Sequence, residues 1–211
     1  MTDSQESHRE SHRESQLESH WDVLSAAHET LRAAVLGVSE RDWALPTPCD
    51  QWNVTQVLQH AAGDQLAYAS ALTGQPGPAE NPFAPSGVLA EPAVAVIDNA
   101  LRASARAFAA VAPDAAEVPS PLPQGALPAP VAVGACALDA AVHAWDIAVA
   151  TGQQARLDPD LARALMPVAT SIVEPLRGYG AYAAALDADV HDDAAAELLR
   201  YLGRRPDWTA P

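Results

Sequence analysis

Apolar residues recur at helical spacing over most of the chain, in segments separated by proline and glycine. From Trp21 to about residue 38 they fall three, four or seven positions apart, which predicts a first helix. Asn53 and Gln56 have the spacing of an N-terminal capping box, and they predict the start of a second helix. This helix should end at Gly74, because glycine commonly terminates helices.

The middle of the chain continues this alternation of helices and connections. Pro92 suits the first turn of a third helix, which should reach about residue 111. The segments 74–90 and 113–130 hold too many prolines and glycines for continuous helix, so we expect two long loops. A fourth helix is predicted over about 131–150, the longest apolar stretch.

The C-terminal part has weaker signals. Asp158 and Pro159 combine a capping residue with a first-turn proline and predict a fifth helix. Pro167 lies too deep in that helix for a first-turn role, so we expect a kink or a break there. A short last helix is predicted over 192–202, whereas the pattern leaves 174–190 undetermined.

The first residues differ in kind from the rest. The tetrapeptide Glu-Ser-His-Arg occurs at 6–9 and again at 10–13, within a polar segment that has little apolar surface to bury. Such a segment cannot offset its ordering entropy. We therefore divide the chain into a disordered tail (1–20), a four-helix bundle (21–152) and a helical extension packed on the bundle (153–211).

Composition supports an all-α fold and limits the partners. Hydrophobic residues make up 49% of the chain but aromatic residues only 5%, and alanine, the strongest helix former, is the largest single contributor to the apolar residues. The formal net charge is −15, which disfavours nucleic-acid phosphate and anionic membrane surfaces as partners.

The cysteines and the N-terminus indicate the compartment. Cys49 and Cys136 are far apart in sequence, and the N-terminal segment is charged and lacks the apolar core of a signal peptide. We expect two free thiols in a cytoplasmic protein. The apolar stretch 131–150 contains three ionisable side chains, which argues against a membrane span.

The fourth predicted helix carries the candidate chemistry. Asp139 and His143 are four residues apart, so both side chains lie on one face and could hold a divalent ion together. A third ligand must come from another helix, and His60, in the middle of the second, is the best candidate. Two explanations that involve no metal stay open at this point: Asp139 and His143 could form a surface ion pair, and His60 could be a core histidine.

Several neighbours could assist such a site. Asp146 could orient His143 by accepting a hydrogen bond, as metal-bound imidazoles usually require. Asp64 follows His60 by one helical turn and could be a ligand or an outer hydrogen-bond acceptor, but a surface carboxylate is the simpler expectation. Arg102 and Arg106 share a helix face and could receive a carboxylated substrate, although a solvated face is again simpler.

Three segments resemble the mycothiol-dependent maleylpyruvate isomerase family, within the wider DinB-like superfamily of metalloproteins. The first is 42–54, with Asp-Trp followed by Pro-Thr-Pro-Cys-Asp-Gln-Trp-Asn-Val. The second is His60, at the distance where the family places a metal-binding histidine. The third is 139–146, which fits an acidic residue, three residues, His, one residue and Trp-Asp. The ending 203–208, Gly-Arg-Arg-Pro-Asp-Trp, is similar to one actinobacterial branch.

The resemblance implies a DinB-like four-helix bundle that holds a divalent metal, zinc, on His60, Asp139 and His143. It further implies mycothiol as a thiol cofactor and a small electrophile as the substrate of a transferase or isomerase, in a monomer or homodimer. Asp139 stands where the isomerase has Glu, and Gln51 stands where the family usually has Gly. Two alternatives are a non-catalytic metal- or partner-binding module and a metal-dependent hydrolase.

Overall fold

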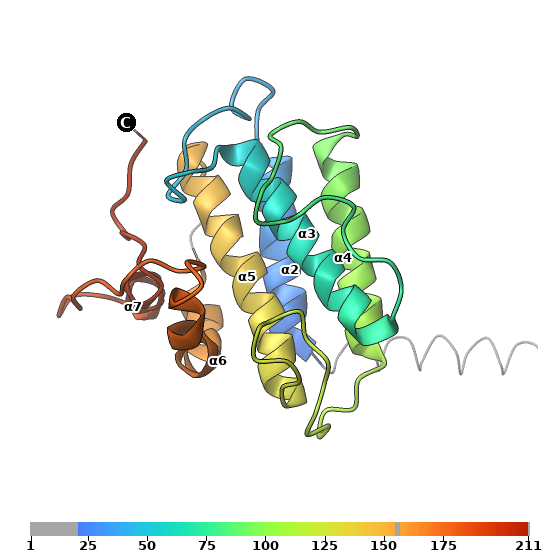
Figure 1. Cartoon of the computed structure of the whole chain (residues 1–211). Helices are drawn as coiled ribbons and strands as arrows, with labels where there is room; N and C mark the ends of the chain where they lie inside the picture. The colour runs from blue at the N-terminus through green and yellow to red at the C-terminus, as the bar shows by residue number, and fades with distance from the viewer. Residues whose placement is uncertain (1–20, 155–156, 211) are drawn as a thin grey trace, which may run out of the picture.

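The computed structural model describes residues 21–154 and 157–210, and the regular structure in these ranges is helical (Figure 1). The helices are α2 (Asp22–Leu36), α3 (Val54–Thr73), α4 (Ala93–Ala109), α5 (Ala129–Ala150), α6 (Pro159–Arg177) and α7 (Ala194–Tyr201). Isolated β-bridges join Pro46 to Asn53 and Val118 to Leu127, and no strand occurs within the described ranges. The all-α prediction is confirmed. The predicted disordered tail, 1–20, lies outside the described residues.

Helices α2 to α5 form a four-helix bundle, and α6 and α7 lie outside it against the α5 side (Figure 1). Helices α2 and α5 run in one direction and α3 and α4 in the other. Helix α5 packs against both α2 and α3, while α4 packs against α3 and α2. The predicted bundle with a short helical extension is confirmed, whereas the exact domain boundaries stay a prediction.

The start of α3 follows the predicted capping box. Asn53 Oδ1 accepts a hydrogen bond from the Gln56 backbone N–H at 2.9 Å, and Gln56 Oε1 accepts one from the Asn53 N–H at 3.0 Å. At the other end Gly74 adopts a left-handed conformation with φ of 70°, which residues with a side chain rarely adopt. These signals fix the register of α3 and therefore the face on which His60 lies.

Helix α5 is the central element of the fold. Nearly all its residues are buried, and many are alanines that let neighbouring helices approach closely. A Cβ atom at Gly134 would lie 2.5 Å from Val168 of α6, so glycine is required for that contact. Among the described helices, α5 alone is long and apolar enough to cross a membrane, but 89% of its apolar window is buried inside the protein.

The structure corrects two expectations about helix ends. Helix α6 continues through Pro167 rather than breaking there, and it also contains Pro175; the alternative expectation, a kink at Pro167, stays a prediction. Both prolines lie on the exposed face, where water can satisfy the carbonyl groups that lose their N–H partners. Helix α5 begins at Ala129, slightly before the predicted start, because Pro130 fits its first turn.

A buried hydrogen-bond network joins all four bundle helices around Gln65. Its Oε1 atom accepts hydrogen bonds from Ser104 Oγ at 2.7 Å and Cys136 Sγ at 3.1 Å, and it lies 2.8 Å from His28 Nε2. Its Nε2 group donates to the Cys136 carbonyl at 3.1 Å. Burial lowers the pKa of His28 to about 4, so this imidazole is neutral. Cys49 and Cys136 are free thiols, as predicted.

The substitution Gln65→Ala should lower the free energy of unfolding by about 2–4 kcal/mol, because it leaves buried donors unpaired and creates a cavity. Urea denaturation measures this change. Gln75→Ala, at an exposed position after α3, is the matched control and should change stability little. Equal effects of the two substitutions would show that the network does not stabilise the bundle.

Candidate metal centre

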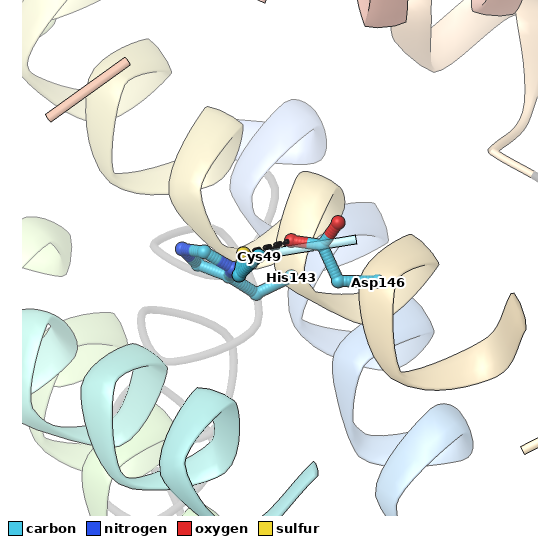
Figure 2. A group of neighbouring side chains, drawn as sticks. All are labelled: Cys49, His143 and Asp146. Atoms are coloured by element: carbon cyan, nitrogen blue, oxygen red, sulfur yellow. Dashed lines mark hydrogen bonds and ion pairs between the residues drawn. The ribbon is translucent and has the colours of Figure 1, made fainter. Parts of the chain in front are cut away.

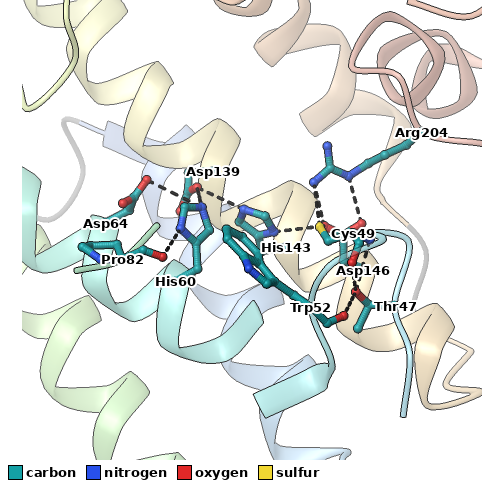
Figure 3. A network of polar contacts seen from close by, with 10 residues as sticks. All are labelled: Thr47, Cys49, Trp52, His60, Asp64, Pro82, Asp139, His143, Asp146 and Arg204. Atoms are coloured by element: carbon teal, nitrogen blue, oxygen red, sulfur yellow. Dashed lines mark hydrogen bonds and ion pairs between the residues drawn. The ribbon is translucent and has the colours of Figure 1, made fainter. Parts of the chain in front are cut away.

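His60 of α3 and Asp139 and His143 of α5 converge between these two antiparallel helices (Figure 3). Asp139 Oδ1 lies 3.3 Å from His143 Nε2 and 3.6 Å from His60 Nε2. One potential ligand atom from each of the three residues lies within 4.8 Å of the others. The sequence prediction that these three side chains meet therefore agrees with the geometry.

The core around His60 determines where its ring points. Three neighbours of His60 on the same helix are fully buried, namely Val57, Leu58 and Ala61. His60 therefore also faces the bundle interior. The Trp52 ring packs against the His60 ring with centroids 4.6 Å apart, and the His143 ring meets it edge-on at 4.7 Å. Both imidazoles are held by packing before any ligand binds.

Hydrogen bonds fix which ring nitrogen of each histidine is available. His60 Nδ1 lies 3.0 Å from the Pro82 carbonyl, and His143 Nδ1 lies 2.9 Å from Asp146 Oδ2. Carbonyl and carboxylate oxygens accept hydrogen bonds, so Nδ1 carries the proton in both rings. The Nε2 atoms, which both face Asp139, are therefore the nitrogens at which a metal ion would take the place of a proton, as in metal-ligating histidines with outer acceptors.

The three residues fit a divalent metal ion. Bonds of about 2.0–2.1 Å in a tetrahedral shell separate neighbouring ligand atoms by about 3.3 Å, close to the two distances measured from Asp139 Oδ1. The other carboxylate oxygen, Asp139 Oδ2, is buried and has no hydrogen-bond partner among the described residues. A buried carboxylate oxygen without a donor is costly, and a cation beside this carboxylate would offset that cost.

The electrostatics of the cluster favour a positive charge at its centre. Burial, together with the neighbouring His143, lowers the pKa of His60 to about 4. Burial also acts to lower the pKa of His143, but the carboxylates of Asp139 and Asp146 outweigh it and raise that pKa well above its usual value. The carboxylates therefore stabilise a positive charge placed between them and the imidazole rings.

Asp146 links this cluster to the C-terminal segment. Its Oδ1 accepts from Arg204 Nε at 2.9 Å, and its Oδ2 accepts from Arg204 Nη2 at 2.8 Å. Burial alone would raise the pKa of Asp146, but Arg204 and His143 hold it below its usual value. Asp146 thus stays ionised and orients His143, as the spacing of these two residues suggested.

Cys49 lies beside His143 and Asp146 (Figure 2). Its thiol donates to Asp146 Oδ2 over 3.2 Å and lies 3.4 Å from Arg204 Nη2. Cys49, His143 and Asp146 form a second group of ligand-type atoms within 4.8 Å of one another. Because Arg204 occupies both Asp146 oxygens, this group suits an ion less well than the group around Asp139.

The proline-containing segment before α3 places Cys49 and Trp52. Thr47 Oγ1 donates to the Trp52 carbonyl at 2.8 Å and accepts from the Cys49 N–H at 3.1 Å. A backbone hydrogen bond from Val54 to Leu45 closes the segment into a loop. The loop directs the thiol toward Asp146 and the indole ring toward His60.

The loop between α3 and α4 forms another side of the centre. Its Pro82 carbonyl fixes His60, and the neighbouring Phe83 ring lies 5.4 Å from the His60 ring, centroid to centroid. The Phe83 side chain is 63% exposed, which is unusual for a large apolar residue beside a buried polar cluster. An exposed aromatic ring therefore lies beside the buried His60 ring.

Some sequence expectations for neighbouring residues were wrong. Asp64 was expected on the surface, but its side chain is only 18% exposed and its Oδ2 lies 3.8 Å from His60 Nε2. The simpler expectation for Arg102 and Arg106 is confirmed, because both are exposed; they line two shallow hollows, one between α2 and α4 and one between α3 and α4, away from the centre. The sequence does not reveal the role of Arg204, although its segment, 203–208, resembles one branch of the family.

Fold and site together define a class of protein, the all-α bundles in which histidine and carboxylate side chains converge between two helices. More particularly, the chain belongs to the mycothiol maleylpyruvate isomerase family, because residues 24–148 match the family model described as the mycothiol maleylpyruvate isomerase N-terminal domain. Two uncharacterized proteins, from two strains of Mycobacterium tuberculosis, are each 32% identical over 188 residues, which cover 87% of this chain and 92% of the relative.

Solved structures share the fold. A crystal structure of the mycothiol-dependent maleylpyruvate isomerase matches with a TM-score of 0.62 and 18% identity, over 90% of each chain. A crystal structure of a mutant of the isomerase matches with a TM-score of 0.54 and 17% identity, over 70% of this chain and 67% of that one. The family match ends at residue 148, so Arg204 lies outside it.

The substitution Arg204→Ala should lower the free energy of unfolding by about 3–5 kcal/mol, because it leaves the buried Asp146 carboxylate without its cation. Thermal and urea denaturation measure the loss. Arg205→Ala removes the same charge from the adjacent, exposed residue and should have little effect. If both variants were as stable as the unaltered protein, the Arg204–Asp146 pair would not hold the C-terminal segment in place.

Proposed function

We propose that this protein binds a divalent metal ion, zinc, through His60, Asp139 and His143. We further propose that it uses the ion to activate a low-molecular-weight thiol, mycothiol, toward a small electrophile. The observation that carries the proposal is the approach of two Nε2 atoms, each with its other nitrogen hydrogen-bonded, to the same Asp139 oxygen. Family membership supports the choice of thiol.

Three protein ligands leave a coordination position open, as catalytic sites require. A bound divalent ion would lower the pKa of a thiol or water at that position. The surrounding residues have separate tasks. Asp146 and the Pro82 carbonyl keep the Nδ1 protons on the two histidines, which leaves Nε2 of each ring as the nitrogen that would bind the ion. The Trp52 ring covers one side of His60 and limits the access of water.

A thiol activated in this way supports two related reactions. In an isomerisation, the thiolate sulfur would add to one carbon of a double bond conjugated with a carbonyl group. The π electron pair would move onto that carbonyl, and the remaining carbon–carbon single bond could rotate. Loss of the same thiol then restores the double bond in the other configuration. In a transfer, the new carbon–sulfur bond forms while a leaving group departs with the electron pair. In both reactions the nucleophile comes from the cofactor, which agrees with the absence of a Ser-His-Asp signature in the sequence.

The proposal includes the setting of the reaction. We assign the protein to the cytoplasm, with the thiol and a small electrophile as its partners. The net charge of −15 disfavours nucleic acid as an additional partner. We retain the division into a tail (1–20), a metal-binding bundle (21–152) and an extension (153–211) as part of the proposal.

Protein purified without a His-tag or chelators should contain about one equivalent of a divalent metal, measured by plasma mass spectrometry. His60→Ala and His143→Ala should each lose it, because two protein ligands hold an ion weakly. His191→Ala, an exposed histidine, is the matched control. A second control lacks residues 1–20, since His8 and His12 could bind adventitious ions. Metal content that is unchanged in both site variants would contradict the assignment.

Mycothiol should raise the thermal midpoint of the metal-loaded protein, because a ligand that binds only the folded state stabilises it. The same addition should leave the midpoint of His143→Ala unchanged. Differential scanning fluorimetry compares the two proteins, with an alcohol analogue of the thiol as the control ligand. An equal shift for both proteins would contradict thiol binding at the metal. Catalysis that needs no thiol would instead favour the hydrolase.

A further inference from the structure

Helices α3 and α5 carry facing pairs of the same two residue types. His60 and Asp64 are one helical turn apart on α3, and Asp139 and His143 are one turn apart on α5. The order of the two residue types along the sequence is reversed on α5. Because the two helices are antiparallel, this reversed order places the two histidines at the same level (Figure 3). The carboxylates of Asp64 and Asp139 lie at the next level, beside His60 Nε2.

Asp64 lacks the partners that a largely buried carboxylate normally has. Its side chain is 18% exposed, and the ion pair available to it among the described residues is the 3.8 Å contact with His60. Two neighbouring carboxylates without a cation are unfavourable, whereas a divalent ion between them would offset both charges.

We propose that Asp64 is a fourth protein ligand of the metal ion, which then has two imidazole nitrogens and two carboxylate oxygens around it. This inference rests on the metal site of the proposed function. The 3.8 Å from Asp64 Oδ2 to His60 Nε2 exceeds the ligand spacing of about 3.3 Å around a zinc-sized ion by about half an ångström. Asp64 lies outside the group of ligand atoms within 4.8 Å of one another, so its carboxylate must move to reach the ion; it is partly exposed and makes no other ion pair with the described residues, which leaves it free to do so.

A fourth protein ligand changes what the centre can do. Four protein ligands would close a tetrahedral shell, so a thiol or water needs a fifth position. Zinc can expand to five ligands, and Fe²⁺, Co²⁺ and Mn²⁺ accept five or six readily. The donor set therefore favours an ion with more than four ligands, and a metal other than zinc would serve equally well.

Cobalt titration of the full-length, metal-free protein tests this inference through the visible absorption of bound Co²⁺, which depends on the number and kind of ligands. Asp64→Asn keeps the shape of the side chain but removes its charge. It should weaken Co²⁺ binding at least about tenfold and change the energy and intensity of the absorption bands. Asp50→Asn removes the same charge from an exposed position and should change neither. His143→Ala gives the background from ions bound elsewhere.

Each result decides between the alternatives. Weaker binding together with a changed spectrum supports Asp64 as a ligand. Unchanged affinity, or weaker binding with an unchanged spectrum, overturns the inference but leaves the three-ligand centre intact. If the unaltered protein took up no cobalt above the His143→Ala background, the proposed metal centre would fail together with the fourth ligand. Circular dichroism of Asp64→Asn and Asp64→Ala verifies that both variants fold.

Discussion

The site depends on the pairing of the buried Asp146 carboxylate with the polar groups around it. A charge removed from water must be paired and hydrogen-bonded, and Asp146 meets this requirement with groups from three separate segments. His143 comes from the same helix, Cys49 from the loop before α3, and Arg204 from the C-terminal segment. The pairing that satisfies the carboxylate also fixes the imidazole ring, so stability and ligand orientation have the same physical cause.

The bundle supplies the second constraint, the close packing of α3 against α5. Alanine-rich surfaces let the two helices approach, and the hydrogen bonds of Gln65 hold the four helices in one register. Slippage of one helical turn would separate His60 from Asp139 and leave several buried polar groups unpaired. A site built from two rigid helices is positioned before a ligand arrives, which reduces the cost of binding.

Local patterns in the sequence predicted much of this arrangement. The capping box at Asn53 and the spacing of Asp139 and His143 involve residues within one helical turn, so their geometry follows from the helix itself. The pairing of Arg204 with Asp146 spans 58 residues and depends on how the chain folds back, which no local pattern encodes. Helix α6 continues through Pro167 because this proline lies on the exposed face of the helix. The spacing of residues in the sequence does not reveal which face of α6 is exposed.

The central claim is that a divalent ion binds between His60, Asp139 and His143. The most direct measurement is an anomalous-difference map from crystals of the protein purified without chelators, with data collected on both sides of the metal's absorption edge. The account predicts one strong peak within bonding distance of the two Nε2 atoms and the Asp139 carboxylate. A map without a peak there, from crystals grown with an excess of zinc, would contradict it.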